Sequence, residues 1–261
     1  MRTIVYGNGK SRQKWNVNEK LDNVVTWGCN RIFNDAKVDN LVSVDYHVQH
    51  LIYESGYAHE NKCWFADWNV LPSSVAYMDM TFGKGKKPNL PITENDRGER
   101  LNVVVNGKFT KPNEGVFITW VDDNDMVEAI DYPREWSSGT TAIHLACQQG
   151  ATEIYLMGFD ISDDPKDNVY EREQSEYHSQ TSSFSLRLDW ARELKTVFTE
   201  FKNIKFIWAE GEKSNRMIDT LNAGELNAVI NKSMIGRDRL IFDNDNLTYD
   251  TYENIRRKIC R

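Results

Sequence analysis

Short runs of β-branched and aromatic residues return at intervals along the chain, and helical stretches separate several of them. The runs that fit central strands are residues 3–6, 24–27, 41–44, 117–120, 153–157 and 205–208. Residues 139–150 fit a compact helix with one apolar face, and the run 153–157 follows at once. Residues 184–201 and 205–208 repeat that helix-to-strand order. Because such units place successive strands parallel, we predict an α/β protein with a doubly wound, mostly parallel, Rossmann-like sheet.

One long segment interrupts this pattern. Residues 83–115 carry the lysine-rich string Gly-Lys-Gly-Lys-Lys-Pro and an Asn106-Gly107 hairpin signal after three valines. We interpret this segment as an insertion or lid on a single α/β domain that spans residues 1–235. Residues 236–261 are polar and charged, and we expect a peripheral helix and tail there.

Composition excludes several classes of protein. The chain has 39 acidic and 32 basic residues, a formal charge of -7, which argues against general capture of nucleic acid. No apolar run approaches the roughly 20 residues that cross a bilayer, and the N-terminal run is too short for a signal peptide. The 4 cysteines form no Cys-x-x-Cys pair. We therefore expect a soluble, cytoplasmic protein with reduced thiols.

A glycine-rich turn, Gly7-Asn8-Gly9-Lys10-Ser11, directly follows the first predicted strand. Backbone N–H groups in such a turn can approach a phosphate or a nucleoside. The spacing matches neither a Walker A loop, since position 4 is isoleucine, nor a dinucleotide fingerprint, since position 12 is arginine. The turn is therefore either a ligand loop or an ordinary strand-to-helix connection.

Metal-ligating residue types are present without a metal-binding spacing. The residues considered for zinc are His47, His50, His59 and Cys63. Their spacing matches no common zinc finger, and we predict no metal site. The acidic clusters 122–125 and 160–164 suit either a divalent cation beside a diphosphate or solvated turns. The lysines of 84–87 fit either a phosphate contact or a charged surface loop.

His178 is the candidate general base. It lies in a polar stretch between the acidic cluster 160–164 and the helix that begins at Phe184. An exposed histidine with a pKa near neutral can accept a proton from a hydroxyl group. An ordinary surface histidine is the alternative.

Four places along the chain, in order, carry a family resemblance. They are Gly7-Asn8-Gly9-x-Ser11 after the first strand, Gly-Cys-Asn-Arg-Ile-Phe at 28–33, the helix and strand from Ser-Ser-Gly at 137–139 to Gly-Phe-Asp at 158–160, and His-Ser-Gln at 178–180 with Lys-Ser-Asn at 213–215. Together they resemble the bacterial sialyltransferases of glycosyltransferase family 42 and the related DUF115 and pterin-pyrophosphokinase-like proteins. The resemblance covers most of residues 1–45 and 134–220. It implies a variant of the GT-A glycosyltransferase fold.

The resemblance also implies a donor site and a mechanism. The implied donor-binding residues are Gly7, Asn8, Gly9, Ser11, Asn30, Asp45, Ser137, Ser138, Gly139, Gly158, Asp160, Tyr170, Ser214 and Asn215. His178 would remove the proton of the acceptor hydroxyl while the nucleotide phosphate leaves the anomeric carbon. No metal and no further cofactor would be required besides the nucleotide sugar itself.

This chain departs from the family where the family handles its acidic sugar. Glu135 matches the family's arginine, and Asp45 matches its asparagine. The leaving-group tyrosines of the family match Ser162 and, after a shift of two residues, Tyr170. Because Glu135 and Asp45 can accept hydrogen bonds from hydroxyl groups, the departures favour a neutral sugar over sialic acid.

The sequence therefore predicts a glycosyltransferase. It would move a sugar from a nucleotide donor to a hydroxyl group on a glycan or on a modified nucleobase in DNA, with no membrane span and with an oligomer possible. One alternative is a Mg²⁺-dependent diphosphokinase that transfers pyrophosphate from ATP to a small alcohol. The other is a non-catalytic protein that binds a nucleotide or a sugar.

Overall fold

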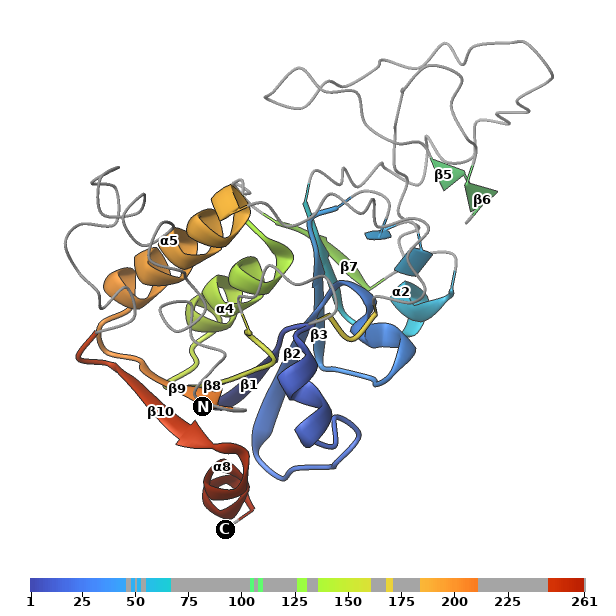
Figure 1. Ribbon diagram of the computed structural model, residues 1–261. Helices are drawn as coiled ribbons and strands as arrows, with labels where there is room; N and C mark the ends of the chain where they lie inside the picture. Colours follow the sequence, from blue (N-terminus) through green and yellow to red (C-terminus); the bar gives the residue numbers. More distant parts are fainter. Residues whose placement is uncertain are drawn as a thin grey trace. The chain divides into compact units, whose positions relative to one another are not determined.

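The computed structural model divides the chain into two compact units, residues 1–39 with 136–261 and residues 40–135 (Figure 1). The residues that the structure describes are 1–45, 48–49, 51–52, 55–66, 104–105, 108–109, 126–130, 136–160, 168–170, 184–210 and 244–260. The first unit holds most of the sequence-predicted site.

The first unit contains a parallel sheet. Its strands are Arg2–Tyr6 (β1), Val24–Cys29 (β2), Glu153–Met157 (β8), Lys205–Glu210 (β9) and Leu247–Thr251 (β10). They pair in parallel in the order β10-β9-β8-β1-β2. The β-branched and aliphatic residues Ile4, Val5 and Leu156 are fully buried in this sheet. The predicted α/β class with parallel strands is confirmed.

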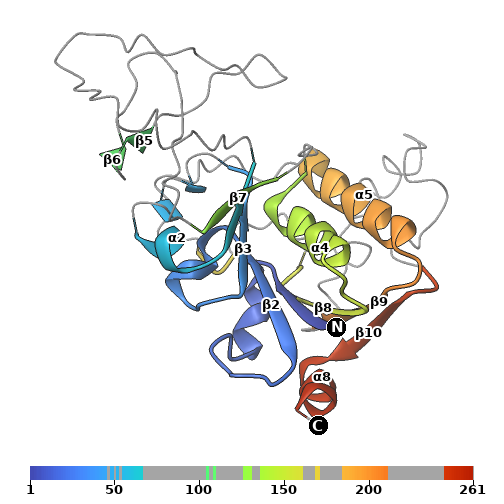
Figure 2. The ribbon, with the colours of Figure 1, turned by 180° about the vertical axis from the view of Figure 1, so that it is seen from behind.

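Helices cover both faces of this sheet (Figures 1 and 2). They are the 3₁₀ helices Lys10–Lys14 (η1) and Asn30–Asn34 (η2) and the α-helices Ser138–Gln148 (α4), Phe184–Glu200 (α5) and Tyr252–Ile259 (α8). Helices α4 and α5 lie side by side on one face, and α8 lies on the other. Phe198 of α5 packs on Phe206 of β9 with ring centroids 4.7 Å apart, and this contact joins α5 to the sheet.

The second unit contains a smaller parallel sheet. Its strands are Asn40–Ser43 (β3), Cys63–Phe65 (β4) and Val127–Ala129 (β7), paired in that order, and a short helix, Tyr57–Glu60 (α2), precedes β4. A separate antiparallel pair joins Val104–Val105 (β5) to Lys108–Phe109 (β6). These strands flank Asn106-Gly107, so the predicted hairpin is confirmed.

The strands that the sequence did not reveal are short or half-exposed. β4 and β7 have 3 residues each, too few to show a periodic pattern. β10 lies within 236–261, where we expected a helix and a tail, and the structure places a strand before the helix α8. Its sequence, Leu-Thr-Tyr-Asp-Thr, is mostly polar because β10 is the last strand at one side of the sheet and only Leu247 is buried. The predicted strand 117–120 lies outside the described residues.

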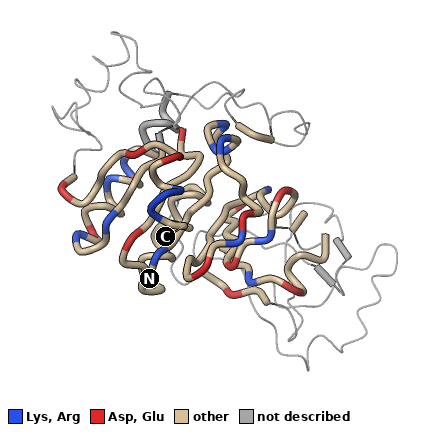
Figure 3. Tube along the Cα trace, turned by 90° about the horizontal axis from the view of Figure 1, so that it is seen from below, with Lys and Arg blue, Asp and Glu red and all other residues tan. Residues whose placement is uncertain are grey.

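The basic residues near the C-terminus gather on α8 (Figure 3). Each has a carboxylate partner: Arg256 pairs with Glu19 at 2.8 Å, Lys258 pairs with Asp250 at 2.7 Å, and Arg257 pairs with Glu253. These pairs neutralise the helix locally. Across the part of the chain that the structure describes, no helix is long and apolar enough to cross a membrane.

Candidate functional site

The carboxyl ends of β1, β2 and β8 form the candidate site. β2 lies on one side of β1, whereas β8, β9 and β10 continue the sheet on the other side, so the strand order reverses at β1. In parallel α/β sheets, ligands bind outside the carboxyl ends of the strands at such a reversal. The loops that follow these strands are therefore the first place to look for binding chemistry.

The glycine-rich turn after β1 packs directly on the loop after β8. The N–H of Gly7 donates to the carbonyl of Met157 at 2.7 Å, and the N–H of Gly9 donates to that of Gly158 at 2.8 Å. A Cβ atom on Gly7 would lie 2.4 Å from the Gly158 oxygen, and one on Gly9 would lie 2.6 Å from it. Contact between the two loops is thus sufficient to require glycine at both positions.

Asp160 occupies the start of η1. Its carboxylate accepts hydrogen bonds from the N–H of Ser11 at 2.7 Å and from the Ser11 hydroxyl. The Tyr252 hydroxyl donates to the Ser11 hydroxyl at 3.2 Å and accepts from the N–H of Gly158 at 3.3 Å. Burial raises the pKa of Tyr252 to about 12, so it is protonated near neutral pH. The protein's own carboxylate therefore takes the Ser11 donors that the turn would offer an anion.

Glu193 of α5 plays the same part at the start of α4. It accepts from the N–H of Ser137 at 3.1 Å and from the Ser137 hydroxyl at 3.0 Å, and its residue is only 8% exposed. The Ser137 hydroxyl also caps the helix by accepting from the N–H of Thr140 at 3.3 Å. Negative charge at a helix N-terminus is favourable because of the helix dipole. Here that charge comes from the chain itself.

The start of α4 also contacts the loop after β8. A Cβ atom on Gly139 would lie 3.2 Å from the ring of Phe159 and 3.9 Å from the sulfur of Cys29. The start of α4 at Ser138 and Gly139 therefore lies beside the ends of β2 and β8.

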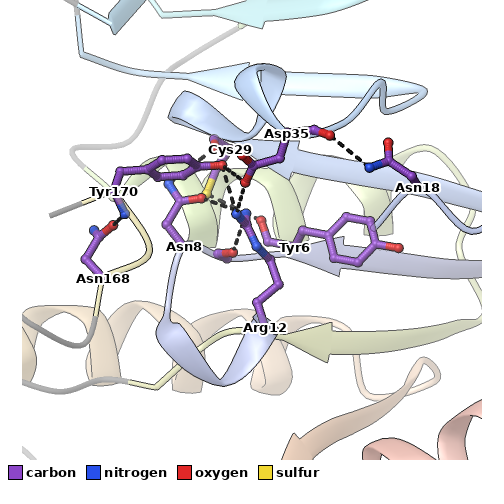
Figure 4. Close-up of polar contacts among 9 residues, drawn as sticks. Tyr6, Asn8, Arg12, Asn18, Cys29, Asp35, Asn168 and Tyr170 are labelled. Atoms are coloured by element: carbon purple, nitrogen blue, oxygen red, sulfur yellow. Dashed lines mark hydrogen bonds and ion pairs between the residues drawn. The ribbon is translucent and has the colours of Figure 1, made fainter. Parts of the chain in front are cut away.

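A buried arginine joins the loops of this site (Figure 4). Arg12 is 2% exposed. Its Nη1 donates to the carbonyl of Gly7 at 3.2 Å and to Oδ1 of Asn8 at 3.1 Å. Its Nη2 donates to Oδ2 of Asp35 at 2.7 Å and to the Tyr170 hydroxyl at 2.8 Å. The guanidinium thus ties the β1 turn to the end of η2 and to Tyr170.

Tyr170 completes this network. Its hydroxyl donates to Oδ2 of Asp35 at 2.6 Å. Burial raises the pKa of Tyr170 well above its ordinary value, although the charge of Arg12 opposes the shift, so the hydroxyl keeps its proton. The adjacent N–H of Val169 donates to the carbonyl of Asn8 at 2.9 Å. Residues 168–170 are therefore fastened along the glycine-rich turn.

The end of β2 joins the same cluster. The side-chain amide of Asn8 donates to the carbonyl of Cys29 at 3.3 Å. The next residue, Asn30, has a φ of +50°, a left-handed conformation that asparagine adopts more readily than most residues. This geometry turns the chain sharply from β2 into η2, which ends beside Asp35.

The structure brings most of the predicted donor-binding residues to one edge of the first unit's sheet. They are Gly7, Asn8, Gly9, Ser11, Asn30, Ser137, Ser138, Gly139, Gly158, Asp160 and Tyr170. Asp45 lies in the second unit after β3, where its carbonyl accepts from the N–H of Gln49 at 2.9 Å. His178, Ser214 and Asn215 lie outside the described residues.

Sequence reasoning missed the roles of Arg12 and Asp35. Arg12 entered only as a departure from the dinucleotide fingerprint. A signal for Asp35 was present, because an acidic residue after the second strand of an α/β nucleotide site often binds ribose hydroxyls. Its spacing from the glycine-rich turn differs from the usual one, which hid it.

The zinc candidates divide in the structure. Cys63 is buried, and burial raises the pKa of its thiol, so the thiolate that zinc needs is disfavoured. His59 is exposed, whereas His47 and His50 lie outside the described residues. Among the residues that the structure describes, no group of three or more histidine, cysteine or acidic side chains is placed to hold a metal ion. The acidic cluster 122–125 lies outside them.

We compared the chain with protein-family models, with curated proteins and with solved structures, and none of them matches it.

Proposed function

We propose that the first unit is the donor-binding part of a glycosyltransferase of GT-A-variant type that moves a neutral sugar from a nucleotide donor to an acceptor hydroxyl. The observation that carries the proposal is the convergence of the loops after β1, β2 and β8 with the start of α4. They meet where the strand order reverses, the usual position of a nucleotide in a parallel α/β sheet.

The charges around this edge support a ligand rich in hydroxyl groups. Asp35, Asp160 and Glu193 all place carboxylates there. Carboxylates accept hydrogen bonds from hydroxyl groups and repel a ligand carboxylate. This pattern supports a neutral sugar over an acidic one. Because Asp160 takes the Ser11 donors, we expect other groups to hold the nucleotide phosphate.

His178 is the proposed general base. In the chain it lies between Tyr170, which is fastened to the β1 turn, and Phe184, which begins α5. In the proposed reaction, His178 takes the proton of the acceptor hydroxyl, whose oxygen forms a bond to the anomeric carbon. The bond from that carbon to the nucleotide phosphate breaks, and the phosphate leaves with its electron pair. No metal takes part in this scheme.

Transfer assays test the proposal. Purified protein is incubated with UDP-glucose, GDP-mannose or CMP-sialic acid, and with a glycan or hydroxymethylated DNA as acceptor, with and without EDTA. We expect transfer from a neutral-sugar donor that persists in EDTA. His178→Ala should abolish transfer and leave donor binding intact, whereas the matched control His59→Ala, an exposed histidine of the second unit, should change neither.

The same assays separate the alternatives. Consumption of ATP that stops in EDTA, without sugar transfer, would favour the diphosphokinase. A second candidate, a non-catalytic sugar or nucleotide receptor, is favoured by one observation: Asp160 and Glu193 fill the helix starts where a reacting phosphate is commonly held. Such a receptor would bind the donor without turnover and would be indifferent to His178→Ala.

A further inference from the structure

Asp35 differs from Asp160 in how its two carboxylate oxygens are used. Oδ2 accepts from Arg12 at 2.7 Å and from Tyr170 at 2.6 Å. Among the residues that the structure describes, Oδ1 receives no hydrogen bond, and the side chain is 37% exposed. Asp160, by contrast, is only 7% exposed, and both of its oxygens accept from Ser11.

If Arg12 and Asp35 formed a purely structural ion pair, both oxygens of the carboxylate would be expected to accept hydrogen bonds from the guanidinium. Arginine and carboxylate commonly bind through two parallel hydrogen bonds. Here only Nη2 of Arg12 reaches Asp35, and Nη1 is directed to Gly7 and Asn8 instead (Figure 4). Two donors therefore hold one carboxylate oxygen, while the other receives no hydrogen bond from the described part of the chain. This arrangement fixes the carboxylate in advance and lowers the entropic cost of using its other oxygen.

The surroundings define the ligand chemistry that suits this oxygen. Asp35 follows η2 at the end of β2, beside the turn after β1, and the pairing with Arg12 balances its charge. A carboxylate in this place can accept two hydrogen bonds from neighbouring hydroxyl groups. We infer that Asp35 recognises a vicinal diol of the ligand, either on the ribose or on the transferred sugar. This inference rests on the proposed nucleotide-sugar function.

Binding measurements with matched variants test the inference. The probes are UDP-glucose, UDP, 2′-deoxy-UDP, CMP and 2′-deoxy-CMP, measured by calorimetry and thermal shift. Asp35→Asn should weaken binding of the preferred probe by about tenfold or more, as expected for loss of a hydrogen bond to a charged group. The control is Asp39→Asn. Asp39 is also exposed and has one oxygen held by two donors, the N–H and hydroxyl of Thr26, but it has no place in the Arg12 network.

The probes distinguish the two sources of the diol. If the ribose is recognised, a 2′-deoxy nucleotide binds the unaltered protein as weakly as the matching ribonucleotide binds Asp35→Asn. The Asp35→Asn variant then binds UDP and 2′-deoxy-UDP alike, and CMP and 2′-deoxy-CMP alike. If the transferred sugar is recognised, deoxy and ribose probes bind alike. The advantage of UDP-glucose over UDP then disappears in the variant.

Asp35→Glu keeps a carboxylate for Arg12 but moves its oxygens, so it decides the question if Asp35→Asn does not fold. A folded Asp35→Glu should lose the same discrimination between probes. Unchanged affinity and discrimination in a folded Asp35 variant would overturn the inference and leave the proposed function standing. If no probe binds the unaltered protein, the proposed function fails and the inference fails with it.

Discussion

Replacing Arg12 with methionine should destabilise the first unit more than any other change in the Arg12 network. Arg12 is 2% exposed, and its guanidinium donates four hydrogen bonds, to Gly7, Asn8, Asp35 and Tyr170. Methionine fills a similar volume but leaves these acceptors without their donor.

The loss of stability in Arg12→Met depends on which of the four acceptors water can hydrate once the guanidinium is gone. Asp35 is 37% exposed on its side chain and can be hydrated once Arg12 is gone, so its cost is reduced. The Gly7 carbonyl belongs to a buried residue and cannot be hydrated as easily. Each buried polar group left unsatisfied costs about 1–3 kcal/mol. We therefore expect the free energy of unfolding to fall by about 3 kcal/mol.

Urea unfolding monitored by tryptophan fluorescence measures this change. With a slope of about 3 kcal/mol/M, the midpoint should move by about 1 M. The matched control is Lys10→Met, an exposed residue of the same 3₁₀ helix, which should stay within about 0.5 kcal/mol of the unaltered protein. An Arg12→Met midpoint that matches the control would refute the reasoning. The double variant Arg12→Met with Asp35→Asn should lose less stability than the two single variants lose in total, because the two residues share one interaction.

Three further predictions concern packing, capping and pH. Gly7→Ala should lower the free energy of unfolding several times more than Gly139→Ala. The methyl group added at Gly7 would lie 2.4 Å from a backbone carbonyl, whereas the one added at Gly139 would lie 3.2 Å from a ring that can move, and alanine favours the helix there. Denaturant midpoints that rank the two variants the other way would contradict this. Ser137→Ala should cost about 1 kcal/mol through loss of the α4 cap, seen as a lower melting temperature, and Ser137→Asp should not restore it, since Glu193 already places a negative charge there. Burial raises the pKa of Tyr6 and of Tyr252 to about 12 in the folded protein. Their contribution to the free energy of unfolding is therefore fully present below a pH of about 10, the pKa of tyrosine in the unfolded chain, and is lost as the pH rises through about 12. Absorbance at 295 nm should show these tyrosines ionising together with alkaline unfolding, and a smooth titration of the folded protein near pH 10 would be the contrary result.

The sequence by itself was enough for the local elements of the fold. The runs at 3–6, 24–27 and 153–157 became β1, β2 and β8, because a run of β-branched and aromatic residues and the order of helix and strand are properties of neighbouring residues. The Asn106-Gly107 turn was likewise readable from its two residues and the valines before it. β10 was not readable, since a strand with one buried residue can remain polar elsewhere.

The sequence also placed the glycine-rich turn correctly at the end of β1, but its meaning came only from tertiary structure. Asp160 is 149 residues from Ser11 along the chain, and Tyr170 is 158 residues from Arg12. Whether the turn's N–H groups face a ligand or a carboxylate of the same chain depends on which distant loop packs against them. Because β8 pairs with β1, the loop after β8, which carries Asp160, is the one that packs against the turn.

Asp35 shows the same division most clearly. Its position after the second strand is a feature of the sequence, whereas the pairing of one oxygen with Arg12 and Tyr170 exists only because three loops meet at the carboxyl ends of adjacent parallel strands. Local patterns determine which segments become strands and helices, because hydrophobic burial acts on their periodicity. The long-range pairing of those segments decides which polar groups are satisfied within the chain.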